Sequence, residues 1–103
     1  MYSVRYLPIA RQDFVDIVRY ISIVLQNPAA AERLTEQLID AVEGLSHFPY
    51  ANPVYIPIKP LKREYRKLSV KNYFVFYSVD EARHEVTIYR AIYARRNYEK
   101  VLL

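Results

Sequence analysis

The first half of the chain changes its hydrophobic period once. In YSVRYLPI, apolar and polar side chains alternate, which predicts a short first strand with Val4 and Tyr6 on one face, joined by Tyr2. Pro8 ends this strand. From Ala10 the apolar positions recur three and four residues apart, which predicts an amphipathic helix. The stripe of this helix consists of Phe14, Ile17, Val18, Ile21 and Leu25.

A second helix follows after a short bend. Asn27 precedes Pro28, and this order places an N-cap residue before a proline at the first helical position. Pro49 ends the periodic segment. The two helices therefore form an antiparallel helical hairpin. The apolar stripe of the second helix consists of Ala31, Leu34, Leu38, Ala41, Val42, Leu45 and Phe48.

The second half of the chain begins with a connector and continues as strands. Residues 49–61, PYANPVYIPIKPL, contain four prolines and predict a stiff, extended connector over the surface. Three segments then have the composition of strands, at about residues 62–70, 72–79 and 84–93. The tail ARRNYEKVLL is expected to dock Val101 and Leu102, as a short helix or as an extension of the last strand.

This order of elements predicts an α+β fold. The arrangement is β-α-α-β-β-β, with an N-terminal helical hairpin packed on one face of a twisted antiparallel sheet. The other face of the sheet is expected to stay open and to carry alternate aromatic and basic side chains. The length of 103 residues allows one core, so we expect a single domain over residues 1–103.

Charge is distributed unevenly between the two halves. Residues 1–48 have a balance of −2, whereas residues 49–103 have a balance of +6. Such an asymmetry is typical of a basic face that meets a polyanion or an acidic partner, although a solvated basic surface would look the same.

Other features of the composition limit the chemistry. The chain has no cysteine and two isolated histidines, His47 and His84, so neither a metal nor a cofactor is expected. Its single glycine cannot build a phosphate-binding loop, and no serine stands in a nucleophile motif. The N-terminus lacks the pattern of a signal peptide, and no apolar run is long enough for a bilayer. We therefore expect a cytoplasmic protein without membrane contact.

The basic and aromatic residues of the second half are the main chemical signal. Cations of this kind hold phosphates and aromatic rings stack on bases, but the same groups would suit an acidic protein segment. Because strand residues alternate between faces, about half of the rings should be core, Phe76 among them. The cations are Lys59, Lys62, Arg63, Arg66, Lys67, Lys71, Arg90, Arg95, Arg96 and Lys100.

Arg90 stands apart from the other cations because it alternates with apolar residues. It is in phase with Val86, Ile88 and Ile92, the apparent core positions of the last strand. A buried arginine needs a partner, and Asp13 or Asp16 could supply it. The alternative is that Arg90 lies in a cleft, on a face of the sheet other than the one that this alternation indicates.

Four blocks of the sequence resemble the RelE/ParE superfamily of bacterial type II toxins. They are YLPIARQDFVDIVRYI, NPAAAERLTEQLIDAVEGLSHFP, YRKLSVKNYFVFYSVDE and VTIYRAIYARRNY, which together cover most of the chain. The resemblance implies the fold predicted above. It also implies that the protein is the toxin of an operon-encoded pair, a class that includes plasmid-stabilisation systems. The cognate antitoxin of such a pair holds the toxin inactive in a hetero-oligomeric complex.

Two activities occur in this superfamily, and the resemblance implies different site residues for each. RelE-like members are metal-independent nucleases that cut messenger RNA on the ribosome, whereas ParE-like members poison DNA gyrase. For a nuclease, the implied catalytic candidates are Lys67, Arg95, Arg96 and Tyr98. Phe74, however, stands where the nuclease motif has its arginine, and Tyr93 stands where many relatives have a histidine.

The long helical hairpin is also more similar to that of ParE-like members than to that of the nucleases. Gyrase is therefore the favoured target, and cleavage of messenger RNA is the alternative. A plain RNA-binding module is a third possibility. Whichever target applies, the residues expected to contact the target or the antitoxin are Arg63, Arg66, Lys67, Tyr73, Tyr93 and Arg95.

Overall fold

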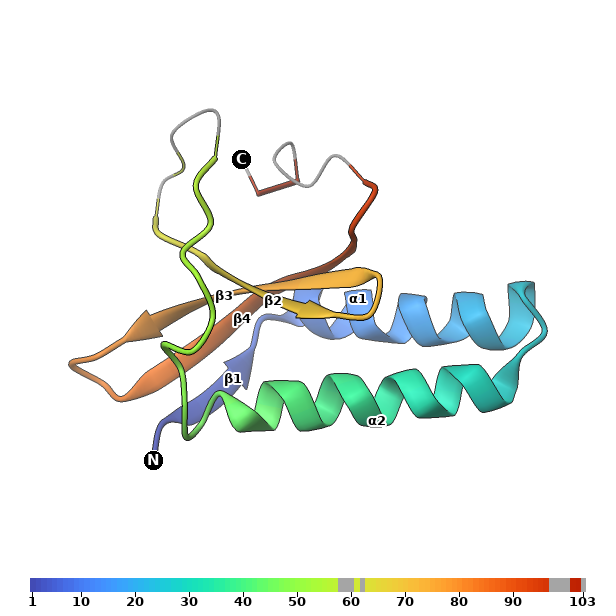
Figure 1. Cartoon of the computed structure of the whole chain (residues 1–103), viewed down its shortest axis with the longest axis horizontal. Coiled ribbons are helices and arrows are strands. Elements are labelled where there is room, and N and C mark those ends of the chain that lie inside the picture. Colours follow the sequence, from blue (N-terminus) through green and yellow to red (C-terminus); the bar gives the residue numbers. More distant parts are fainter. Residues whose placement is uncertain (58–60, 62, 97–100, 103) are drawn as a thin grey trace.

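The chain folds as a helical hairpin on a four-stranded sheet (Figure 1). The computed structural model describes residues 1–57, 61, 63–96 and 101–102. The predicted α+β order is confirmed. The elements are β1 (Ser3–Tyr6), α1 (Pro8–Arg19), the π-helical turn η1 (Tyr20–Val24), α2 (Pro28–Gly44), β2 (Arg66–Val70), β3 (Tyr73–Asp80) and β4 (Glu85–Tyr93).

The strand order is β1-β4-β3-β2, and it is not wholly antiparallel. β2, β3 and β4 form the expected antiparallel meander, but β1 runs parallel to β4 from Ser3↔Glu85 to Tyr6↔Ile88. The prediction of an antiparallel sheet was therefore wrong for its first strand. Between β1 and the meander, the whole helical hairpin acts as the crossover that a parallel pair requires.

The hairpin forms where the sequence predicts it. Asn27 caps α2 by accepting a hydrogen bond from the Ala30 N–H at 3.1 Å. Two residues of the predicted stripes are exposed, however. Leu25 follows the π-helical turn η1, at the bend between the two helices, and is exposed. Phe48 lies beyond the end of α2 and is also exposed.

The main core lies between the hairpin and one face of the sheet. Phe14 and Ile17 of α1 pack there with Leu38 of α2. From the sheet, this core receives Val75 and Val86, both fully buried. In Figure 1 the bend between α1 and α2 extends beyond the ends of the strands, so the far half of the hairpin has no sheet above it.

The second face of the sheet is partly covered, in contrast to the open face that was predicted. Phe76, Ile92 and Tyr65 are buried there in a separate cluster. Tyr55 and Leu61 of the connector pack against it, and so do two residues of the tail, Val101 and Leu102. The docking of the tail is thus confirmed, and burial of Phe76 is confirmed as well.

A β-bulge explains why Ile92 belongs to this second cluster. The register between β3 and β4 shifts at Phe76/Tyr77, so Phe76 pairs with Arg90 whereas Tyr77 pairs with Ile88. One extra residue on a strand reverses the face of those that follow. The alternation had predicted that Ile92 shares a face with Val86 and Ile88, but it does not.

No helix in the described part of the chain is long and apolar enough to cross a membrane.

Candidate functional site: a groove beside the hairpin

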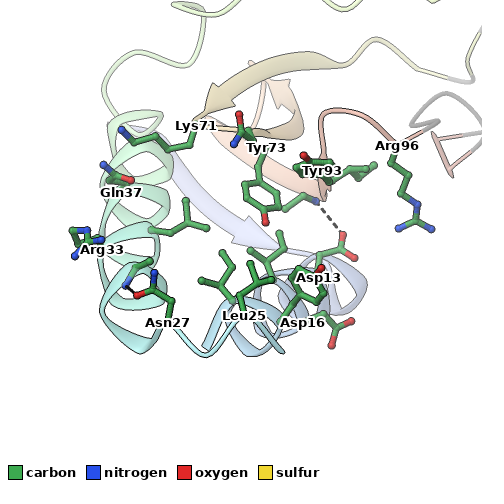
Figure 2. A pocket seen from close by; sticks show the side chains of 18 residues that line it. Asp13, Asp16, Leu25, Asn27, Arg33, Gln37, Lys71, Tyr73, Tyr93 and Arg96 are labelled. Carbon is green, nitrogen blue, oxygen red and sulfur yellow. Dashed lines mark hydrogen bonds between the residues drawn. The ribbon is translucent and has the colours of Figure 1, made fainter. Parts of the chain in front are cut away.

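A large groove lies where the hairpin extends past the sheet (Figure 2). Its volume is about 1160 Å³. Asp13 and Asp16 reach it from α1, and Arg33 and Gln37 from α2. From the sheet side, Lys71 lines the groove from the β2–β3 turn and Tyr73 from the start of β3. Tyr93 lines it from the end of β4, and Arg96 from the turn that follows.

Aromatic and aliphatic side chains form the apolar part of this groove. Tyr73 and Tyr93 are cross-strand partners whose rings meet edge to face, with centroids 5.6 Å apart. Burial raises the pKa of Tyr73 above its ordinary value. Ile17, Ile21 and Leu34 add aliphatic surface from the helices. An apolar groove bordered by charges can accept an amphipathic peptide segment.

One carboxylate of the groove is already paired. Arg90 Nε donates to Asp13 Oδ2 at 2.7 Å, and Arg90 Nη2 donates to Asp13 Oδ1 at 3.0 Å. The Ala91 N–H donates to the same carboxylate at 3.0 Å. This arrangement confirms that Arg90 is a structural arginine, because both of its bonds tie α1 to β4. Asp16, one turn further along α1, accepts a hydrogen bond from Gln12 and stays exposed.

Lys67 lies on the other face of the sheet. Its ammonium sits 4.4 Å from the centroid of the Phe74 ring and 5.7 Å from that of Tyr55. Phe74 in turn meets Phe76 edge to face, with centroids 6.3 Å apart. Nearby, Arg63 Nη1 donates to the Tyr89 hydroxyl at 2.6 Å. Lys67 and Arg63 are thus both engaged with aromatic side chains.

Arg66 is directed to the connector. Its Nη1 donates to the Asn52 carbonyl at 2.7 Å, and its guanidinium lies 4.9 Å from the centroid of the Tyr50 ring. Asn52 also donates to the Tyr77 hydroxyl, which itself donates to the Pro49 carbonyl. These contacts hold the start of the connector against the sheet.

A cluster around Glu81 was not predicted from the sequence. Tyr2 and Tyr50 both donate hydrogen bonds to its carboxylate. The His84 ring stacks on the Tyr2 ring, with the two centroids 4.4 Å apart. The bond to Glu81 raises the pKa of Tyr50 to about 12. The same bonds lower the pKa of Glu81. No local signal reveals this cluster, because its members come from three distant segments.

Among the residues that the structure describes, no group of histidine and carboxylate side chains could hold a metal ion.

Residues 4–98 match the family model described as the ParE toxin of the type II toxin–antitoxin system, parDE. The chain belongs to this family. The match covers most of the 103 residues, so it includes the hairpin, the sheet and the large groove. The ParE-family chain is therefore a toxin of a type II toxin–antitoxin system, within the RelE/ParE superfamily that the sequence blocks resemble. No curated protein sequence matches it.

Solved structures share the fold of this ParE-family chain. A chain of the chromosomal ParDE system from P. aeruginosa superposes with a TM-score of 0.73 at 18% identity, covering 92% of this chain and 98% of that one. A chain of a RelBE toxin–antitoxin complex from Mycobacterium tuberculosis gives 0.61 at 22% identity, with coverages of 89% and 96%. The intact E. coli RelBE complex gives 0.58 at 15% identity, with coverages of 93% and 100%.

The residues predicted for the site of this ParE-family chain fall into separate places. Tyr73, Tyr93 and Arg96 share the large groove, whereas Lys67 and Arg63 lie on the second face with its aromatic cluster. Arg66 contacts the connector, and Arg95 is exposed in the turn after β4. Tyr98 lies outside the described residues. Sequence reasoning missed the helical side of the groove, notably Arg33 and Gln37, to which it assigned no role.

Proposed function

We propose that this toxin acts on DNA gyrase and does not cut messenger RNA. The observation that carries the proposal is the packing of Phe74. A nuclease must surround the reacting phosphate with convergent hydrogen-bond donors and cations. At the position where the nuclease motif has an arginine, this chain instead has an aromatic ring, packed against Phe76 and covered by the Lys67 ammonium.

The placement of the other cations supports the same proposal. Lys67 lies on the second face, whereas Arg96 lines the groove on the hairpin side of the sheet. Arg95 is exposed beside Arg96 in the turn. Two of the three described candidates for phosphate stabilisation, Lys67 and Arg96, are therefore directed to different sides of the sheet. The similarity to a ParE family model over residues 4–98 adds further support.

The proposed partner is a cognate antitoxin, since the similar structures are from ParDE and RelBE systems. The large groove is the site that suits it best. Its apolar lining, with Tyr73 and Tyr93, can bury one face of a peptide, and Lys71, Arg33 and Arg96 can face acidic residues of that peptide. Within residues 65–80, Tyr65, Val70 and residues 75–77 are buried, so we assign this contact to the exposed turn around Lys71.

The experiment compares the two activities directly. Purified toxin is incubated with gyrase and supercoiled DNA, and the accumulation of cleaved DNA is measured. Messages from cells that express the toxin are examined in parallel by primer extension. We expect growth arrest and cleaved DNA, both reversed by the co-expressed antitoxin, and no new 5′ ends within codons.

The variants Lys67→Ala and Arg96→Ala distinguish the alternatives. New 5′ ends that disappear in either variant would replace the gyrase proposal by ribosome-dependent cleavage of messenger RNA. Gyrase that stays unaffected at excess toxin would also contradict it. A control variant at Arg83, an exposed residue of the β3–β4 turn, should leave all readouts unchanged.

A further inference from the structure

The two edges of the sheet differ in how they are covered. At the β2 edge the connector pairs with the strand. There the Lys67 N–H donates to the Pro53 carbonyl at 3.1 Å, and Val54 forms an isolated bridge with Arg66. β1 forms the opposite edge of the sheet. A strand edge without such a cover presents unpaired N–H and C=O groups, on which another extended chain can pair.

The hydrogen bonds of β1 leave part of its outer side open. Ser3 and Leu7 donate their N–H groups to carbonyl groups of β4 and of the residue before it, at 2.9 and 3.0 Å. Because successive residues of a strand direct these groups to opposite sides, Val4 and Tyr6 direct theirs away from β4. Among the described residues, no hydrogen bond reaches the N–H of Val4 or Tyr6, or the Val4 carbonyl.

A groove separates this open part of β1 from the end of α2. Its volume is about 560 Å³. The side chains of Val4 and Tyr6 line it from β1 and also pack against the main core. An added Cβ at Gly44 would have no heavy atom within 4 Å, so the end of α2 leaves space beside the strand. From α2 and the turn that follows it, the lining residues are Val42, Glu43, Gly44, Ser46 and His47.

We propose that the β1 edge binds an extended segment of a partner protein as a fifth strand of the sheet. In this mode of recognition, main-chain hydrogen bonds provide affinity and alternate side chains provide specificity. The N–H and C=O groups of Val4 and the N–H of Tyr6 are the main-chain partners on this edge. Side chains that face Val4 and Tyr6 across the pairing would enter the groove. Apolar residues suit these positions, because Val42 and the open space at Gly44 lie there.

Charge defines the residue between these two apolar positions. It would lie opposite Arg5, on the other face of the strand. Arg5 Nε is 3.9 Å from a Glu85 carboxylate oxygen, yet the Arg5 side chain stays 59% exposed. An acidic residue therefore suits this position. Glu43 lines the groove, so negative charge is unfavourable at the two groove positions. The expected segment thus reads apolar–acidic–apolar.

The geometry of β1 argues against a second copy of this chain as the occupant. A two-fold dimer would pair β1 with its copy in the antiparallel direction. If the pairing is centred on Val4, Tyr6 lies opposite Tyr2 of the copy. The outer side of Tyr2 is already covered, because its N–H donates to the Ser46 carbonyl at 2.8 Å. If the pairing is centred on Arg5, two arginines lie directly opposite each other, which is destabilising.

The inference depends on neither the proposed target nor the proposed antitoxin contact, because this groove and the large groove share no lining residue.

The test uses the full chain, labelled with ¹⁵N, and a peptide of about eight residues in which valine and glutamate alternate. A control peptide has the same composition and charge, but its valines and glutamates stand in adjacent pairs. We expect the amides of Val4 and Tyr6 to exchange hydrogen faster than those of Ser3 and Leu7 in the free chain. Only the alternating peptide should shift the signals of Val4 and Tyr6 and slow their exchange at least tenfold.

Methylation of the peptide nitrogens tests the main-chain contact itself. Methyl groups on the valines remove the donors that face β1 in an antiparallel pairing, and methyl groups on the glutamates remove those that face it in a parallel pairing. We expect one of these two peptides to bind at least tenfold more weakly and the other to retain its affinity. Loss of affinity in neither peptide, or equally in both, would overturn the proposal.

Variants of the chain test the groove and the charge separately. Gly44→Leu fills the groove and should weaken the alternating peptide at least tenfold, whereas Gly44→Ala should change its affinity by less than twofold. Both residues suit this helical position, which has no positive φ, better than glycine does. Arg5→Gln should weaken binding by about two- to fivefold, as expected for an exposed ion pair. Arg19→Gln removes the same charge from an exposed position of α1 and should have no effect.

Three results would contradict the proposal. They are an unchanged affinity in Gly44→Leu, signal shifts centred on Lys71 and Tyr73, and a dimer of the free chain that Gly44→Leu dissociates in sedimentation.

Discussion

Replacing Asp13 by alanine should cost this fold more than any other single change on the surface of α1. The Asp13 carboxylate accepts two hydrogen bonds from Arg90 and one from the Ala91 N–H. The side chains of Arg90 and Asp13 are only 17% and 12% exposed. In Asp13→Ala the guanidinium would lose its carboxylate partner and the Ala91 N–H would lose its acceptor.

The magnitude follows from this geometry. Removing one partner of a fully buried pair costs about 3–5 kcal/mol, and the residual exposure of this pair reduces the figure to about 2–4 kcal/mol. For a domain of this size, such a loss lowers the midpoint of thermal unfolding by roughly 10–25 °C. Urea unfolding followed by circular dichroism measures the free energy directly. Asp16→Ala is the matched control, since Asp16 is exposed on the same helix and should change stability by about 0.5 kcal/mol at most.

A double-mutant cycle tests the reasoning behind this number. Asp13→Leu combined with Arg90→Met removes both charges, so no charge of the pair stays buried. We expect the double variant to be at least about 1 kcal/mol more stable than the sum of the two single losses predicts. Additive losses would refute the coupling, and so would a loss for Asp13→Ala no larger than that for Asp16→Ala.

Three further changes test other parts of the fold. Asn27→Ala removes the cap of α2 and should lower the free energy of unfolding by about 1 kcal/mol in urea titrations. Phe76→Ala should cost about 3–5 kcal/mol, and Phe74→Ala less, because Phe76 is fully buried and Phe74 only partly. The bond from Tyr50 to Glu81 stabilises the fold below pH 10 and is lost as the pH rises through about 12, while at acid pH it is lost as Glu81 becomes protonated. Glu81→Gln should return the pKa of Tyr50 toward 10 in a ¹³C-tyrosine NMR titration, and an unchanged pKa would show that the carboxylate charge is not its cause.

Much of the fold could be predicted because local patterns and long-range packing agree in it. The order of elements, the cap at Asn27 and the structural role of Arg90 were all accessible from spacing and residue type. One deviation in winding was not. The bulge at Phe76/Tyr77 moves Ile92 to the second face. A periodic pattern assumes constant winding, so one additional residue reverses every assignment beyond it.

The candidate site was less accessible than the fold for a different reason. Tyr73, Tyr93 and Arg96 were selected from the sequence, and the structure brings them together. The opposite wall of the groove comes from α1 and α2, and no sequence signal separates Arg33 from an ordinary solvated residue. Conversely, Lys67 and Arg63 resemble site residues in the sequence, yet their cations contact aromatic rings on the other face.

The charge asymmetry of the sequence acquires a structural meaning in the hairpin. Adjacent residues on a helix point about 100° apart, so Glu32 and Arg33 belong to different surfaces of α2. Arg33 joins Lys71 and Arg96 at the large groove, whereas Glu32 and Glu36 lie on a different, exposed stripe of α2. The helix α2 thus presents the charge of Arg33 to the large groove and keeps these two carboxylates out of it. The acidic antitoxin segment that we propose would therefore meet Arg33, and not Glu32 or Glu36, in this groove.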